Sequence, residues 1–169
     1  MKTKLTPELS YIIGLWSKRR TVEGIGIIGY PEAQEVFVKE VLSQNLTPSD
    51  KMLTDADKVY FYHSRYRKFF QQVEEDKLER YKYLNEYAAS YLAGVFDAVG
   101  GITERGVVYL NRFNSIDEVL LLRLGFPVKK SEGKLLIGRP KAFLLFIKNY
   151  TKLFTTHPVM ETLKKKGRR

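Results

Sequence analysis

Hydrophobic and polar positions along this chain follow two periods, and the change from one to the other separates helices from strands. Apolar residues at helical spacing predict helices at 7–18, from 31 onward, at 65–73, 83–98, 115–124 and 140–154, and a short last helix from 158. Between them, β-rich residues bounded by glycine, proline or charged turns predict strands or hairpins at 21–30, 51–63, 101–110 and 127–137. Thr6 and Ser115 are suited to cap helices, and Pro7 to begin one.

These elements follow the order αββαββα twice, in residues 1–80 and again in 81–169, which is an α+β arrangement. The segment 11–20 can be laid on 91–100 without a gap, 80 positions apart, and 26–28 then falls on 106–108. With a separation of 76, the segments 58–61 and 65–70 fall on 134–137 and 141–146. The common order of these weak matches predicts an internal duplication.

The helix that ends near residue 99 is the most informative segment. It contains the small residues Ala93, Gly94 and Ala98, which would let another helix backbone come unusually close. A glycine pair follows it, as is typical of a helix C-terminus. Asp97 opposes the helix dipole there, so we expect it to have a local hydrogen-bond partner or a function.

The residues Leu92-Ala93-Gly94-Val95-Phe96-Asp97-Ala98-Val99-Gly100 resemble the signature of the LAGLIDADG homing endonucleases. Segment 11–20 resembles a degenerate second copy of the same motif. The resemblance implies a single chain with two motif helices at a pseudo-twofold axis, and two antiparallel sheets forming a saddle around them. It also implies a metal-binding acid near the end of each motif helix. At those two positions this chain has Arg19 and Val99, so the motif predicts no catalytic residue, with Asp97 as a residual candidate.

Metal-dependent cleavage of a phosphodiester needs oxygen ligands, usually carboxylates, beside the scissile phosphate. Valine cannot ligate a metal, and an arginine repels one. The remaining weak candidates for metal ligands are Asp97, Glu23 and Glu104. We therefore expect no cofactor, with Mg²⁺ reserved for the alternative in which these acids replace the usual ligands.

The chain carries 29 basic and 19 acidic side chains, a formal net charge of +10. Residues 1–85 hold 14 of the basic and 12 of the acidic residues, whereas residues 86–169 hold 15 and 7. This asymmetry predicts a basic face on the second half and a polyanionic partner. Nine cations are candidates for nucleic-acid contacts: Lys18, Arg19, Arg20, Arg105, Arg112, Lys129, Lys130, Lys134 and Arg139. A mobile basic tail at 164–169 would add nonspecific affinity.

Other classes of protein are disfavoured. The absence of cysteine excludes disulfides and thiolate metal sites. No apolar run is long enough to span a bilayer, and the N-terminus does not lead into a signal-peptide core, so we expect a cytoplasmic protein without a membrane partner. The aromatic residues Tyr60, Tyr62, Tyr66, Phe69 and Phe70 are predicted to pack in the core and sheet and not to stack on bases.

The sequence therefore predicts a monomeric protein that binds nucleic acid, and double-stranded DNA in particular, without cutting it. An active Mg²⁺-dependent endonuclease with substitute acids is the first alternative. A regulator, a maturase-like RNA-binding role and a protein-interaction module that kept only the fold remain open as well.

Overall fold

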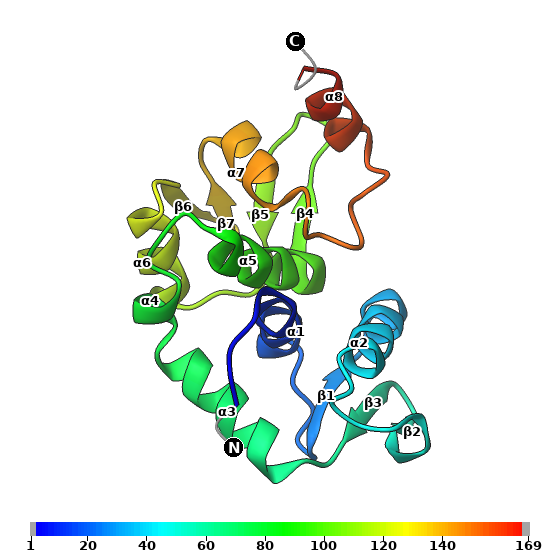
Figure 1. The fold of residues 1–169 in the computed structure, drawn as a ribbon. Helices are drawn as coiled ribbons and strands as arrows, with labels where there is room; N and C mark the ends of the chain where they lie inside the picture. Colours follow the sequence, from blue (N-terminus) through cyan, green and yellow to red (C-terminus); the bar gives the residue numbers. More distant parts are fainter. Residues whose placement is uncertain (1–2, 167–169) are drawn as a thin grey trace.

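The structure, a computed structural model, describes residues 3–166 (Figure 1). The elements before residue 81 are α1 (Pro7–Ser17), β1 (Ile25–Ile28), α2 (Pro31–Ser43), the 3-10 turn η1 (Ser49–Lys51), β2 (Leu53–Asp55), β3 (Lys58–Phe61), α3 (Ser64–Glu75) and α4 (Lys77–Arg80). Those after it are α5 (Glu86–Val99), β4 (Gly100–Ile102), β5 (Val108–Leu110), α6 (Ser115–Arg123), β6 (Val128–Ser131), β7 (Lys134–Ile137), α7 (Pro140–Ile147) and α8 (Pro158–Lys166). Side chains of the predicted basic tail at 164–169 lie outside the described residues.

The strands form two antiparallel sheets, as predicted. The second sheet has the order β4-β5-β7-β6, and the elements around it follow αββαββα. The first sheet has only three strands, in the order β1-β3-β2. The missing strand is reduced to one isolated bridge between Arg20 and Ile27, because the chain turns back at Gly24, where φ is +54°.

The helix α7 ends earlier than the sequence predicts. It stops at Ile147 and not near residue 154. The chain beyond it leaves the helical path because Thr151 and Lys152 turn inward to donate hydrogen bonds to Asp97. A tertiary contact therefore overrides the apolar periodicity of 148–154.

The two motif helices, α1 and α5, cross at the centre of the molecule with their backbones in direct contact. A Cβ atom added at Gly14 would lie 2.1 Å from the carbonyl oxygen of Tyr91, and one added at Gly94 would lie 2.2 Å from that of Tyr11. Each glycine therefore faces the helix that carries the other, in a reciprocal arrangement. No other residue fits either position without moving a backbone.

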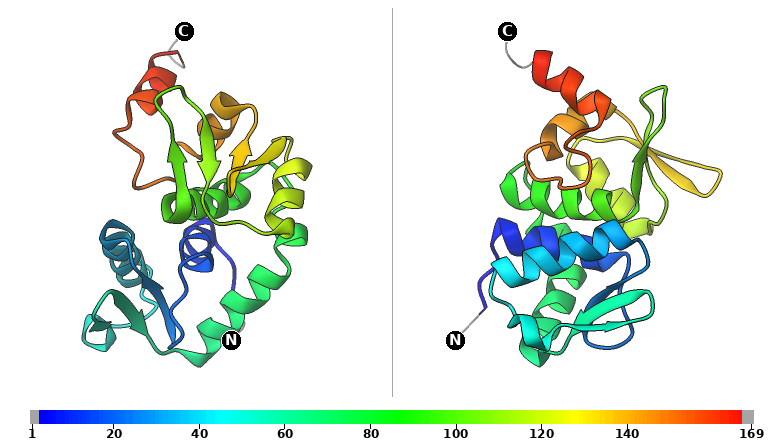
Figure 2. Two further views of the ribbon diagram at one scale, coloured as in Figure 1. Left: turned by 180° about the vertical axis from the view of Figure 1, so that it is seen from behind. Right: turned by 90° about the vertical axis from the view of Figure 1, so that its right-hand side faces the viewer.

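One face of each sheet is buried against helices and the other is open. Val59 and Phe61 of β3, and Val108 and Leu110 of β5, point into the core. Figure 2 shows from behind that the strands lie in front of α1 and α5, and from the side that the two sheets diverge from the C-terminal ends of these helices. The open faces form the two arms of a saddle. Within the described residues, no helix combines the length and the apolar composition that crossing a bilayer requires.

Candidate nucleic-acid interface

The centre of the saddle is formed by the C-terminal ends of α1 and α5, and an arginine lies on each. The Arg19 Nε atom donates to the carbonyl oxygen of Ala98 at 2.6 Å. Arg112 Nη1 donates to the carbonyl oxygen of Lys18 at 3.1 Å. Ala98 and Lys18 occupy matching positions of the two motif helices. Helix C-termini carry partial negative charge and unpaired carbonyl groups, so a guanidinium stabilises each end.

Each half of the chain thus supplies the arginine that caps the helix of the other half. Burial, and then the neighbouring Arg112, lower the pKa of Arg19 below its ordinary value. Arg112 is exposed to solvent, so its guanidinium is accessible to an anion.

The donors at the saddle centre do not fit a divalent metal ion. Val99 is 3% exposed and offers only its carbonyl, which accepts from the amide of Asn111. Glu23 is ion-paired with Lys58, and Glu104 lies exposed on the turn between β4 and β5. Among residues 3–166, no three His, Cys, Asp or Glu side chains are grouped so that they could hold a metal. The weak candidates Asp97, Glu23 and Glu104 are therefore not brought together.

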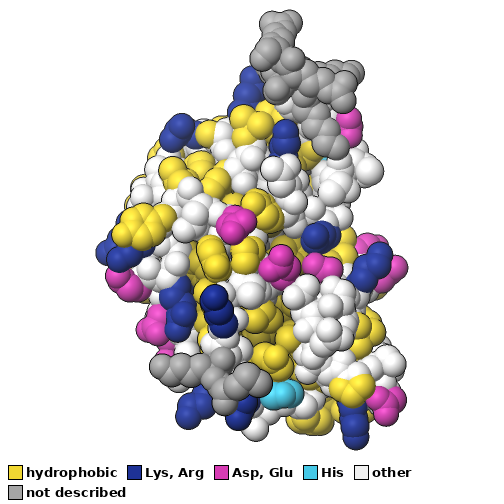
Figure 3. Space-filling view, viewed as in Figure 1, with side chains coloured by type: hydrophobic (Ala, Val, Ile, Leu, Met, Phe, Trp, Pro, Cys, Tyr) yellow, Lys and Arg dark blue, Asp and Glu magenta, His cyan; other side chains and the backbone are white. Residues whose placement is uncertain are grey.

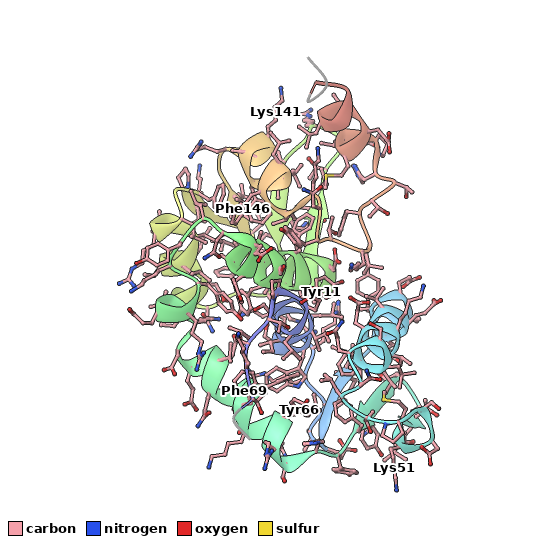
Figure 4. The ribbon with its side chains drawn as sticks, viewed as in Figure 1. Tyr11, Lys51, Tyr66, Phe69, Lys141 and Phe146 are labelled. Carbon is pink, nitrogen blue, oxygen red and sulfur yellow. The ribbon has the colours of Figure 1, made fainter. Side chains whose placement is uncertain are left out.

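Asp97 is a buried hydrogen-bond acceptor, 1% exposed, and it ties three segments together. Its carboxylate accepts from Tyr11 of α1 at 2.6 Å, from the hydroxyl of Thr151 and from the amide of Lys152 at 2.7 Å. Burial raises the pKa of Asp97, and these hydrogen bonds offset part of the rise. Figure 4 shows Tyr11 where α1 approaches the neighbouring helices. The expectation of a hydrogen-bonding role is confirmed.

We expect Asp97→Asn to lower the free energy of unfolding by about 2 kcal/mol, because the new amide group must face at least one donor and leave it unpaired. Urea titration followed by fluorescence of Trp16, the single tryptophan, measures this change. Asp55→Asn, on an exposed strand position, serves as the matched control. Equal stability of the two variants would contradict the role assigned to Asp97.

A buried cluster of charges lies beside this centre and includes one of the predicted phosphate ligands. Lys18 and Lys77 both donate to Asp117, and Lys77 also donates to Glu74 at 2.8 Å. The side chain of Lys18 is only 9% exposed, and that of Lys77 only 2%. Lys18 is therefore removed from the predicted phosphate-binding set, since its ammonium group is already paired and covered.

The other predicted cations divide by the direction in which they point. Lys129 and Lys134 are exposed and share the open face of the second sheet, where Lys134 lies 4.4 Å from the ring centroid of Tyr109. Arg105 is exposed at the turn between β4 and β5. No ion pair between described residues involves these three side chains. They remain candidates for phosphate contacts.

Two of the cations predicted to contact nucleic acid instead contact other groups of the protein. Lys130 alternates with Lys129 and points to the helical side, 3.9 Å from Glu118 of α6. Arg139 donates to the carbonyl oxygen of Gly125 at 3.0 Å and so fixes the loop before β6. Strand residues alternate between the two faces of a sheet, so the sequence alone could not predict which of these cations point to the open face.

Arg20 is exposed, but it pairs with Ile27, which faces the core, and its guanidinium lies 4.1 Å from the ring centroid of Trp16. The ring holds the side chain in place without neutralising its charge. The helical side of the molecule, by contrast, carries basic and acidic side chains interspersed (Figure 3). The open face of the second sheet and its hairpin turn, with Arg105, Lys129 and Lys134 exposed, are therefore the candidate interface for a polyanion.

Sequence reasoning missed the cluster of Glu74, Lys77 and Asp117. Glu74 and Lys77 belong to a segment that reads as a solvated connector, because it contains many charges and few apolar residues. The one available signal was the sequence Asn114-Ser115-Ile116-Asp117, which forms a capping box in the structure.

The fold and the central helix pair together define a homing-endonuclease architecture. No family model matches the chain, and no curated protein matches its sequence. Among solved structures, the chain is similar to the homing endonuclease I-DmoI: a structure of its mesophilic variants shares 14% identity over 83% of this chain and 95% of that chain, with a TM-score of 0.59. A crystal structure of I-DmoI in complex with DNA and Mn gives a TM-score of 0.57 at 14% identity, covering 83% of this chain and 96% of that one. The resemblance seen in the motif is thereby confirmed at the level of the fold.

Proposed function

We propose that this protein binds double-stranded DNA in its saddle as a monomer and does not cut it. The observation that carries the proposal is the pair Arg19 and Arg112, each bonded to the end of a motif helix. Guanidinium groups at these ends attract phosphate but repel the metal ions that hydrolysis at this position requires.

Three further features support a DNA partner. The open face of the second sheet presents Lys129 and Lys134, and Arg105 extends the charge to the tip of the hairpin. Contacts of this kind position a duplex through its phosphates without reading its sequence. The solved structure of I-DmoI with DNA and Mn shows that a protein of this fold can hold DNA. Both halves are present in one chain, so no second copy is needed to complete the saddle.

The test is a binding and cleavage assay on a random-sequence duplex library, with and without Mg²⁺ or Mn²⁺, at two salt concentrations. We expect DNA to be retained intact, with an affinity that falls steeply as salt rises. Sequencing the retained pool then measures any sequence preference. Metal-dependent cut ends would overturn the non-cutting part of the proposal, and salt-independent retention or none would overturn the DNA part.

We expect the double substitution Lys129→Ala and Lys134→Ala to weaken duplex binding about 10-fold at low salt, because two phosphate contacts are lost. The slope of log affinity against log salt should fall by about 2, one for each lysine. Fluorescence anisotropy of a labelled duplex measures both quantities. The matched control replaces Lys39 and Lys141, exposed lysines of α2 and α7, the second of which is labelled in Figure 4, and should leave both the affinity and the slope unchanged. Equal losses in the two double variants would contradict the placement of DNA on the saddle.

A further inference from the structure

The open face of the first sheet is aromatic where that of the second sheet is basic. Tyr60 and Tyr62 alternate along β3 and its end, so both rings lie on the open face. Their centroids are 5.7 Å apart at an interplanar angle of 87°. Tyr62 is 64% exposed, so the expectation of core and sheet packing is wrong for this ring, whereas Tyr60 is half-buried in the sheet. An exposed tyrosine ring beside a half-buried one on an open sheet face is a surface on which unpaired bases can stack.

The charges on this face do not suit a duplex backbone. Lys58, the cation of β3, is ion-paired with Glu23, and Asp55 lies directly across the strand pair from it. The neighbouring apolar side chains Ile28 and Leu53 are 38% and 39% exposed. Phosphates gain little from a neutralised lysine, whereas bases gain from apolar and aromatic contact.

A cleft of about 810 Å³ opens directly next to Tyr62. It is larger than the cleft of about 470 Å³ beside the buried cluster of Lys18, Lys77 and Glu74. The lining of the larger cleft includes Asn45, Thr47, Asp50, Lys51, Leu53 and His63. The ring of His63 is held in place, since Nδ1 accepts from the amide of Tyr66 at 3.2 Å and the two rings lie 4.4 Å apart. Figure 4 shows Lys51 at the outer end of this region.

This combination matches the chemistry of a nucleotide. The rings of Tyr62 and His63 offer flat surfaces for a base, and Asn45, Thr47 and Asp50 offer donors and acceptors for its edge. Lys51 offers a cation for the attached phosphate. Paired bases present only their edges in a groove, so a surface of rings serves nucleotides that are not base-paired.

We infer that the first sheet and its cleft bind unpaired nucleotides, so that the preferred ligand is a duplex carrying a single-stranded extension. The inference rests on the proposed function for the duplex part. The second sheet then holds the duplex through phosphates, and Tyr60, Tyr62 and the cleft hold the bases of the extension. A protein partner on the same face is the competing occupant, and it would show no dependence on bases.

The experiment compares three labelled ligands by anisotropy: a blunt duplex, the same duplex with a DNA or RNA extension of about six nucleotides, and the same extension made abasic. We expect the extension with bases to bind about 10-fold more tightly than the blunt duplex, and the abasic extension to bind like the blunt duplex. The DNA and RNA arms identify which nucleic acid is preferred. An abasic extension that binds as well as the natural one would overturn the inference, because phosphates alone would then account for the gain.

Substitutions at Tyr62 test whether its aromatic ring is responsible for the tighter binding of the extended duplex. Tyr62→Ala should abolish most of the preference for the extension and leave blunt-duplex affinity unchanged, whereas Tyr62→Phe, which keeps the ring, should retain it. Tyr83→Ala is the matched control, since Tyr83 is 65% exposed in the segment before α5. Retention of the full preference by Tyr62→Ala would overturn the inference.

The two proposals fail in distinguishable ways. If the blunt duplex does not bind, the proposed duplex function fails, and a single-stranded oligonucleotide with and without bases still tests the cleft alone. If the blunt duplex binds and the extension adds nothing, only the inference about the first sheet fails.

Discussion

Replacing Gly94 by alanine is expected to lower the free energy of unfolding by about 3 kcal/mol or more. The new Cβ would lie 2.2 Å from the carbonyl oxygen of Tyr11 and 2.6 Å from the amide nitrogen of Leu15. Both are backbone atoms of α1 and cannot rotate away, so the helices must separate along their whole contact. Overpacking of this kind costs about 1–3 kcal/mol where side chains can adjust, and more where they cannot.

Chemical denaturation followed by Trp16 fluorescence measures the loss, and Gly14→Ala should behave alike because its contact is the reciprocal one. Gly106→Ala is the control: φ there is +84°, but nothing lies within 4 Å of the added Cβ. It should cost only about 1 kcal/mol from backbone strain. A loss at Gly94 no larger than at Gly106 would show that the helices do not meet as described.

Removal of the Asp117 carboxylate is expected to cost about 3–5 kcal/mol, since it leaves Lys18 and Lys77 covered and without their shared partner. Asp117→Ala also removes the acceptor for the amide of Asn114 at 2.8 Å, which is one of the two hydrogen bonds of the capping box of α6. The matched control is Glu118→Ala, whose partner Lys130 is exposed and 3.9 Å away, and which should cost less than about 1 kcal/mol. Similar losses in the two variants would contradict the buried cluster.

The same cluster gives an expected pH dependence. Burial opposes ionisation of Asp117, but Lys18 and Lys77 outweigh it and hold its pKa below the ordinary value of 3.8. A carboxyl group with a lowered pKa in the folded state stabilises the protein above its unfolded pKa and loses that effect as pH falls through the folded pKa. The difference in unfolding free energy between the native chain and Asp117→Ala should therefore be full at neutral pH and shrink below about pH 3.8. A difference that grows on acidification would exclude this assignment.

The central helix pair could be predicted from the sequence because its signal is local. Gly94, the small residues around it and the glycine pair after Val99 specify close approach and a helix end within one short segment. The αββαββα order of the second half follows from the same kind of local pattern. The absence of acids at positions 19 and 99 is likewise a direct property of the residues present.

The remainder depends on distant contacts that no local pattern encodes. Lys18 reads as one of three cations at a helix end, and only its approach to Asp117, 99 positions away, makes it part of the core. Lys129 and Lys130 are neighbours in sequence, yet the register of β6 turns one to the open face and the other to Glu118. Tyr62 was assigned to core and sheet packing with its aromatic neighbours, but it lies just past the end of β3 on the open face and is exposed.

Arg19 and Arg112, which cap the motif helices of the opposite halves, make it difficult for a single substitution to create a metal site at the centre of the saddle. A carboxylate introduced at position 19 would lose the cap on α5 and would stand in the field of Arg112, where it would form an ion pair in preference to a metal site. A carboxylate at position 99 would enter a place that is 3% exposed and lined by apolar side chains. Each of these carboxylates is unfavourable on its own, so acids at both helix ends would require the loss of Arg112 as well. The two arginine caps therefore protect the present arrangement of the helix ends against single substitutions.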